Sequence, residues 1–182
     1  MPGTVLAGRY QLDAIRVDAT GSSTSAMQFD ATDVSSQEAV SVRIVALANL
    51  IDPALGSTTP DDALGAYESQ ADIAASLRHP CIESVLDHGE VTLDGDRYVF
   101  TVGERLAGGS LREFLDRGRR LTPSQALIVG IDACRGLDAA AKQGITHGDL
   151  RPSRLVFGLD RRVRLVGFGA PLRALDTLGL DQ

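Results

Sequence analysis

The feature that most constrains this fold is a change in hydrophobic pattern halfway along the chain. In the first half, three stretches carry strand signals, either alternation of apolar and polar residues or a dense run of β-branched residues: Arg9–Val17, Ala26–Asp33 and Val40–Leu47. In the second half, the apolar residues recur every three or four positions, as they do on amphipathic helices. Strands followed by helices predict an α+β fold rather than an alternating α/β fold.

The first half also contains one predicted helix. Thr59 is a candidate N-cap and Pro60 suits the first turn of a helix over Asp61–Arg78. Two further strands are predicted over Ile82–Leu93 and Arg97–Glu104, on either side of an Asp-Gly turn. The residues before the helix, from Asn49 to Pro60, are predicted to form a polar loop. The first half is therefore expected to form five strands and one helix.

Two capping boxes predict the helices of the second half. Ser110 and Glu113 open a short helix that ends at Gly118, and Thr122 and Gln125 open one that runs to about Lys142. The longer helix has apolar residues on several faces, so we expect it to be buried on several sides. Two short strands are predicted after it, at about Leu155–Phe157 and Val163–Val166.

Composition narrows the class of protein. The formal net charge is −6 and 43% of the residues are hydrophobic, which is typical of a globular chain and not of a general nucleic-acid binder. No apolar run approaches the roughly 18 residues of a membrane span. Two cysteines, Cys81 and Cys134, indicate a reducing compartment, so a cytoplasmic location is expected. Lys142 is the only lysine and Asn49 is the only asparagine.

Five motifs, in order along the chain, resemble landmarks of protein kinases. The segment GITHGDLRPSR at 144–154 resembles the kinase catalytic loop, His-Arg-Asp-Leu-Lys-Pro-x-Asn. Gly-Phe-Gly follows it at 167–169, where kinases have Asp-Phe-Gly. The other three are Gly-Gly-Ser-Leu at 108–111 after the hinge, Leu-Arg-His-Pro-Cys-Ile at 77–82, which resembles the end of the kinase αC helix, and Val-Ser-Val-Arg at 40–43 on the third strand. The resemblance implies a protein kinase-like two-lobed fold, with a five-stranded antiparallel N-lobe over 1–103 and a helical, truncated C-lobe over 104–182.

The same resemblance predicts that the nucleotide site is degenerate. The glycine loop keeps Gly21 but has Ser23 and Ala26 at its other glycine positions, and Gln28 at the following valine. Arg43 replaces the lysine that kinases have on the third strand. Gln70 replaces the αC glutamate that pairs with that lysine in kinases. We therefore expect no bound nucleotide or other cofactor.

The metal ligands that the resemblance implies are also replaced. Gly167 stands at the metal-binding aspartate and Arg154 at the catalytic-loop asparagine, so no metal is expected. Asp149, the position of the catalytic base, is kept, and we expect it to hydrogen-bond within its own loop. His147 is expected to pack near Phe168, and Gly103 stands at the gatekeeper position before the hinge. These replacements predict a pseudokinase, that is, a kinase-like domain that is not an enzyme.

Three functions remain open for such a domain. The first is a phosphorylation-regulated protein-interaction or scaffold module. The resemblance extends to the intracellular pseudokinase domain of mycobacterial MviN-type peptidoglycan lipid flippases, which implies control of cell-wall synthesis at the cytoplasmic face of the membrane. It also implies two partners, a bacterial Ser/Thr protein kinase that phosphorylates the domain and a forkhead-associated (FHA) domain that reads the mark. The second function is ligand or nucleotide sensing without phosphotransfer, and the third is weak Ser/Thr kinase activity.

Threonines are the candidate sites for such a mark. Thr58 and Thr59 lie in the polar loop before the predicted helix, each with an aspartate three residues later, and Thr177 is a third candidate. A phosphate would add about −1.5 to −2 of charge and strong acceptors for a reader domain. The alternative is that Thr59 only caps the helix.

Overall fold

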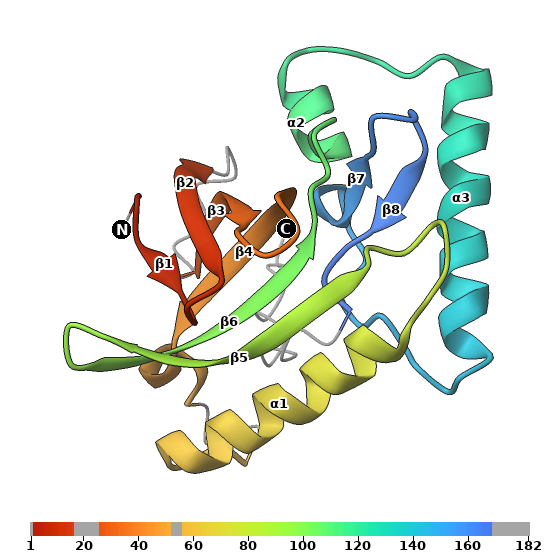
Figure 1. The fold of residues 1–182 in the computed structure, drawn as a ribbon. Helices are drawn as coiled ribbons and strands as arrows, with labels where there is room; N and C mark the ends of the chain where they lie inside the picture. The colour runs from red at the N-terminus through yellow and green to blue at the C-terminus, as the bar shows by residue number, and fades with distance from the viewer. Residues whose placement is uncertain (1, 17–25, 52–55, 169–182) are drawn as a thin grey trace.

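A six-stranded antiparallel sheet forms the first half of the protein. The computed structural model describes residues 2–16, 26–51 and 56–168, and Figure 1 shows the arrangement of their elements. The strand order is β1-β2-β3-β4-β6-β5. The strands are β1 (Val5–Leu6), β2 (Tyr10–Arg16), β3 (Ala26–Asp33), β4 (Glu38–Ala46), β5 (Val85–Leu93) and β6 (Asp96–Glu104).

The sequence predicts five of these strands, and the sixth is β1. It contains only Val5 and Leu6, which pair with Gln11 and Tyr10 of β2. Two residues are too short to show a period, so the pattern could not reveal this strand. Leu6 is nonetheless fully buried in the core of the sheet, beside Tyr10, Leu12 and Phe29.

Helix α1 (Pro60–Ser76) packs on one face of the sheet (Figure 1). Its buried Ala63, Tyr67 and Ala71 contact Val45 of β4 and Val99 of β6. Thr59 is the N-cap, because its side chain accepts a hydrogen bond from the backbone of Asp62 and the Asp62 side chain accepts one in return. Part of the predicted polar loop before α1 is instead a 3₁₀ turn, η1 (Leu47–Leu50), in which Leu47 is buried.

The second half is built from helices and one hairpin. Its elements are α2 (Leu111–Asp116), α3 (Pro123–Ala141), the 3₁₀ turn η3 (Pro152–Arg154), β7 (Leu155–Phe157) and β8 (Val163–Leu165). Strands β7 and β8 pair with each other and lie between α3 and the large sheet (Figure 1). The backbone of Leu165 bonds to Cys81 and Glu83, just before β5, and so ties the two halves together. No helix among the described residues is long and apolar enough to cross a membrane.

Within the described residues, α3 is covered on one face only, and not on several sides as its apolar pattern alone suggests. One face packs against the β7–β8 hairpin, where a side chain at Gly136 would lie 2.7 Å from Leu165 and 2.9 Å from the Cys81 carbonyl. The opposite face exposes Leu127, Ile128 and Ile131. The spacing of the apolar residues correctly predicts a helix. It does not show how many faces of that helix are covered by other elements.

Candidate functional site

The loop between α3 and β7 holds Asp149 in an internal ion pair. Arg154 donates from Nε and Nη2 to Oδ2 of Asp149, at 3.0 and 2.8 Å. Arg151 approaches the other carboxylate oxygen at 3.3 Å. The carboxylate thus bonds within its own loop, held by two guanidinium groups five and two residues later in the chain.

Gly167 lies directly beside Arg154. Its φ is +90°, and a Cβ added there would lie 3.1 Å from Nη1 of Arg154. A residue other than glycine would therefore meet both a strained backbone and the guanidinium group. The structure brings Asp149, Arg154 and Gly167 together, the three positions that the sequence marks as base and metal ligands.

His147 packs against Phe168, as the sequence predicts. The two ring centroids lie 4.5 Å apart, and both residues are buried. The Nδ1 atom of His147 accepts a hydrogen bond from the backbone of Asp149 at 3.3 Å. Burial and the nearby charge of Arg154 lower the pKa of His147 below its usual value. A neutral, packed imidazole stabilises the conformation of the loop.

A polar strip crosses the face of the sheet that α1 partly covers. Gln28, Arg43 and Thr101 are direct partners across β3, β4 and β6, and Ser41 and Gly103 are partners in the next register position. Gln28 donates to the Ser41 hydroxyl at 3.0 Å, and Thr101 shares a short hydrogen bond with Tyr67 of α1. We call these five positions (Gln28, Ser41, Arg43, Thr101 and Gly103) the polar strip.

Gln70, the residue predicted at the glutamate position of αC, is exposed on α1. The α1 side chain that reaches the polar strip is Tyr67, one turn earlier. The carboxylate that reaches the strip comes from another element. Glu83, in the segment between α1 and β5, places Oε1 2.8 Å from the position that a Cβ of Gly103 would occupy.

Sequence reasoning missed Glu83 altogether. Burial raises the pKa of this carboxyl to about 7, the positive charge of Arg43 opposes that rise, and Glu104 adds to it. The only signal in the sequence was a glutamate among the mainly apolar residues that follow the Leu-Arg-His-Pro motif. Perturbed carboxyl groups of this kind gather at functional sites, so Glu83 joins the candidate residues.

The remaining candidates lie elsewhere. Thr58 and Thr59 are exposed at the start of α1, where both interact with Asp62. Gly21, Ser23 and Thr177 lie outside the described residues. Ala26 and Gln28 belong to β3. Within the described ranges, no three His, Cys, Asp or Glu side chains come together as a metal site.

The chain is similar in sequence to bacterial serine/threonine-protein kinases. It is 30% identical over 165 residues to the probable serine/threonine-protein kinase PknB of Corynebacterium glutamicum, covering 91% of this chain and 24% of that protein. A probable serine/threonine-protein kinase of Corynebacterium efficiens is 31% identical over 172 residues, covering 94% of this chain and 24% of that protein. PknB of Mycobacterium tuberculosis is 31% identical over 103 residues, covering 57% of this chain and 16% of that protein. No protein-family model matches the chain.

These relatives contradict the prediction that the chain is not an enzyme, because they are named serine/threonine-protein kinases and so point to an enzyme. That prediction was inferred from each replaced motif position separately. It did not consider that another element can bring a carboxylate to the polar strip, as the segment before β5 does with Glu83 beside Gly103. The chain spans a quarter of these relatives or less. The sequence similarity and the antiparallel sheet with its helix α1 together show that this chain has a protein kinase-like fold, similar to that of bacterial serine/threonine protein kinases.

Proposed function

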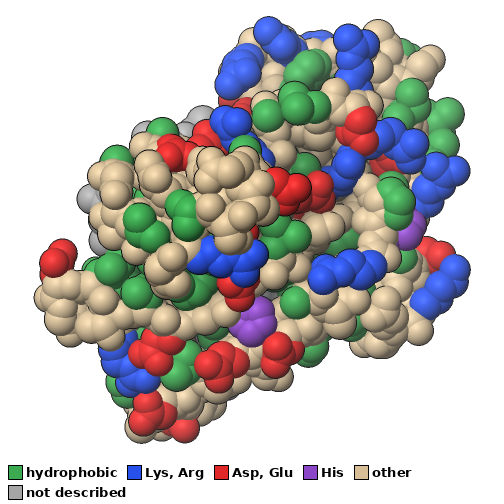
Figure 2. Space-filling view, in the orientation of Figure 1, with side chains coloured by type: hydrophobic (Ala, Val, Ile, Leu, Met, Phe, Trp, Pro, Cys, Tyr) green, Lys and Arg blue, Asp and Glu red, His purple; other side chains and the backbone are tan. Residues whose placement is uncertain are grey.

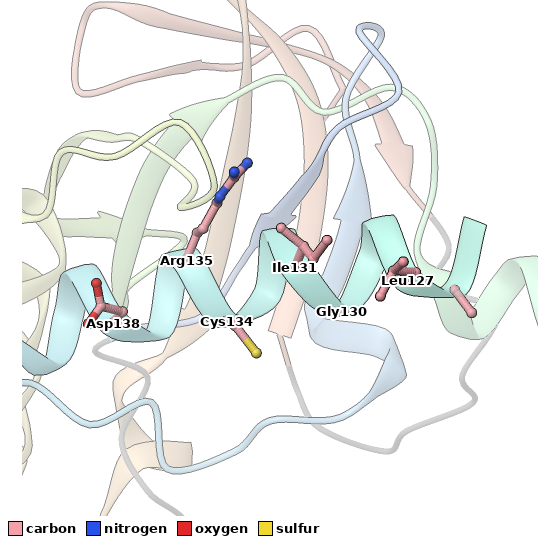
Figure 3. Close-up of a pocket in the computed structure, with 7 residues that line it drawn as sticks. Leu127, Gly130, Ile131, Cys134, Arg135 and Asp138 are labelled. Carbon is pink, nitrogen blue, oxygen red and sulfur yellow. The ribbon is translucent and has the colours of Figure 1, made fainter. Parts of the chain in front are cut away.

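We propose that this kinase-like domain acts as a protein-interaction module in bacterial Ser/Thr kinase signalling, and that a partner docks on the exposed face of α3. The observation that carries the proposal is a shallow, open apolar groove of about 570 Å³ along that face. Seven residues line it: Ala126, Leu127, Gly130, Ile131, Cys134, Arg135 and Asp138. Figure 3 shows them on successive turns of one helix.

The exposure of these side chains supports a binding role. Leu127 is 64% exposed, and Ile131 one turn later is also exposed. Contiguous apolar patches on a folded domain are typical of interaction sites, whereas single exposed apolar residues are common everywhere. The groove ends at Arg135 and Asp138, and a rim of charged residues around an apolar centre is the usual anatomy of a protein interface.

Charge is unevenly distributed around this half of the molecule. Figure 2 shows Lys and Arg side chains gathered over the half that contains α2 and α3, whereas Asp and Glu line the lower edge over α1. A partner with an apolar patch and an acidic rim would match the α3 half. The groove residues lie on the face of α3 opposite to its buried residues, so docking there leaves the contacts of α3 with the hairpin intact.

The partner that we propose is the catalytic domain of a PknB-type Ser/Thr kinase, the class of protein to which the relatives belong. Surface plasmon resonance with the C. glutamicum kinase domain would test it. The double variant Leu127→Asp/Ile131→Asp should weaken binding by about tenfold or more, as expected for residues at the centre of an interface. The matched control is Leu159→Asp, since Leu159 is 85% exposed but lies in the β7–β8 turn. Equal binding of all three proteins, or no binding of the wild type at about 100 μM, would overturn the proposal.

We also propose that the domain is a kinase substrate whose mark is read by an FHA domain, with Thr58, Thr59 and Thr177 as the candidate acceptors. Thr58 and Thr59 are exposed, and the hydroxyl of Thr58 donates to Asp62 at 3.1 Å. A phosphate at this helix N-terminus would be favoured by the helix dipole and opposed by Asp61 and Asp62. The wider role in peptidoglycan synthesis rests on the resemblance to the flippase domain.

Mass spectrometry after incubation with the kinase domain and magnesium-ATP would locate the mark. We expect phosphate on at least one of the three threonines and loss of FHA-domain binding when that threonine is replaced by alanine. Phosphate found only at other residues would contradict the assignment. Thr59 would then be a helix cap alone.

A further inference from the structure

Two segments at one end of the molecule carry an excess of positive charge. Residues 111–122 contain α2 and its connection to α3, and residues 158–164 contain the β7–β8 turn. Together they hold seven arginines and three acidic residues, although the whole chain has a formal net charge of −6. Both segments lie at the upper end of the molecule in Figure 1, and Figure 2 shows Lys and Arg side chains gathered there in the same orientation.

A shared apolar cluster holds the two segments side by side. Val163 of the hairpin belongs to this cluster, and Phe114 and Leu121 of the first segment pack against it. The ring centroids of Phe114 and Phe157 lie 6.4 Å apart. The guanidinium of Arg119 lies over the Phe114 ring, 5.8 Å from its centroid. The connection before α3 and the β7–β8 turn therefore form one continuous surface.

Most of the exposed arginines on this surface have no strong partner. Three of the seven arginines are neutralised by carboxylates, in the pairs Arg112–Asp116, Arg162–Asp132 and Arg164–Asp160, at 2.7 to 3.0 Å. Arg117 only approaches Glu113, at 4.0 Å. Arg119, Arg120 and Arg161 are exposed, and no carboxylate among the described residues pairs with them. We call Arg117, Arg119, Arg120 and Arg161 the basic end.

The chemistry of the basic end favours carboxylate ligands on a peptide. A guanidinium is a planar fork of N–H donors that can bind a carboxylate through two parallel hydrogen bonds. Arg119 already rests on Phe114, so it loses less conformational freedom on binding. A membrane presents negative charge over the whole footprint of the molecule, and the net charge of −6 opposes its approach, whereas a peptide needs to contact only the basic end.

We propose that the basic end binds an acidic segment of a partner protein, that is, an extended peptide rich in Asp and Glu. The segment pairs with arginines of both turns at once, so the connection before α3 and the hairpin act as a single binding surface. The inference goes beyond the docking function and does not depend on it, because none of the four arginines lines the groove on α3.

A fluorescein-labelled peptide of alternating glutamate and glycine is the probe, and fluorescence anisotropy measures its affinity. The triple variant Arg119→Gln/Arg120→Gln/Arg161→Gln should bind it at least about tenfold more weakly than the wild type, because three of the four charges are gone. Raising the salt concentration from about 50 to about 300 mM should also weaken wild-type binding severalfold. The same peptide with glutamine in place of glutamate should not bind.

A charge-matched control separates the basic end from the net charge of the protein. Arg97→Gln/Arg105→Gln/Lys142→Gln removes three exposed or half-exposed cations from other elements and should change the affinity by less than about twofold. Vesicles of phosphatidylcholine and phosphatidylserine in equal amounts test the membrane directly, and we expect no co-sedimentation. The assay contains no kinase domain, so its result is separate from that of the docking test.

Four outcomes would overturn the proposal. They are no binding of the glutamate peptide by the wild type at about 1 mM, equal binding of the glutamine peptide, equal losses in the two triple variants, and binding of the vesicles in place of the peptide. The last outcome would assign the basic end to a lipid surface.

Discussion

At Gly167 two separate constraints select the residue. The backbone has a φ of +90°, which side chains other than glycine rarely adopt, and the guanidinium of Arg154 fills the space next to its Cα. Arg154 is in turn held by Asp149. The three residues depend on one another, so a change at one alters the other two.

Gly167→Ala should lower the free energy of unfolding by about 1 to 2 kcal/mol, because alanine is strained at this φ and its Cβ crowds Arg154. Urea denaturation followed by circular dichroism would measure the effect. The control is Gly65→Ala in α1, where nothing lies within 4 Å of the added Cβ. That change should instead raise stability by about 0.5 to 1 kcal/mol. Equal effects at both glycines would contradict the constraint at Gly167.

The raised pKa of Glu83 predicts a pH dependence of folding. An ordinary glutamate in the unfolded chain titrates near 4.5, whereas Glu83 in the folded protein titrates at about 7. Between these values the folded state binds more protons, so the stability that Glu83 contributes falls as pH rises from about 4.5 to 7. Glu83→Gln should match the wild type in stability at pH 5 and exceed it at pH 8.

Comparing the wild type with Glu83→Gln isolates the contribution of Glu83 to the pH dependence of stability. The lowered pKa of His147 acts in the opposite sense, since the stability it contributes is lost as pH falls below the usual pKa of histidine. That effect is present in both proteins and cancels in their difference. A difference in unfolding free energy that stays constant from pH 5 to 8 would show that Glu83 has an ordinary pKa.

At the scale of elements, the local signals in the sequence were reliable. Strand β3 and strand β7 have the predicted bounds, and Thr59 and Thr122 cap the two long helices with complete capping boxes. Alternation, caps and turns are encoded within a few neighbouring residues, so a single sequence displays them. The short strand β1 and the exposed face of α3 depend on distant partners, which local patterns do not specify.

One long-range contact that the sequence did not show fixes α3 to the hairpin. Asp132 is 2% exposed, and its two carboxylate oxygens accept hydrogen bonds from Arg162 at 2.7 and 3.0 Å and one from the backbone of Val163 at 3.3 Å. Burial raises the pKa of Asp132, but the bonds from Arg162 and Val163 outweigh burial and the net shift is downward. The pair links the middle of α3 to the start of β8.

Asp132→Ala should therefore destabilise the protein by about 3 kcal/mol, because it leaves a buried backbone N–H and a guanidinium without their partner. Asp138→Ala is the matched control on the same helix, since Asp138 is exposed and its side chain pairs with the exposed Lys142 one turn later. Its removal should cost less than about 0.5 kcal/mol. Thermal and urea unfolding would measure the loss of stability in each variant. A similar loss for the two aspartates would contradict a structural role for Asp132.

At the scale of the whole molecule, the order of motifs predicted the kinase-like fold, whereas the motif positions predicted a domain that is not an enzyme, which relatives named as serine/threonine-protein kinases contradict. Arg43, Asp149 and Arg154 could be aligned from the sequence, and the bonding of Asp149 within its own loop was expected, but the approach of Glu83 to Gly103 was not. Glu83 reaches the polar strip only because the segment after α1 is tied to β8 and because Gly103 has no side chain. A contact of this kind forms only once both halves are folded together.

The central claim, that a partner covers α3, is tested most directly at the two cysteines. Cys134 is exposed in the groove and Cys81 is buried, so Cys81 is an internal control for unfolding (Figure 3). The measurement is the rate of alkylation of each thiol by iodoacetamide, followed by mass spectrometry, with and without the PknB-type kinase domain at saturation. We expect Cys134 to react readily in the free protein and at least about tenfold more slowly in the complex. Cys81 should stay unreactive in both. An unchanged alkylation rate of Cys134 in a complex shown to have formed would contradict docking on α3.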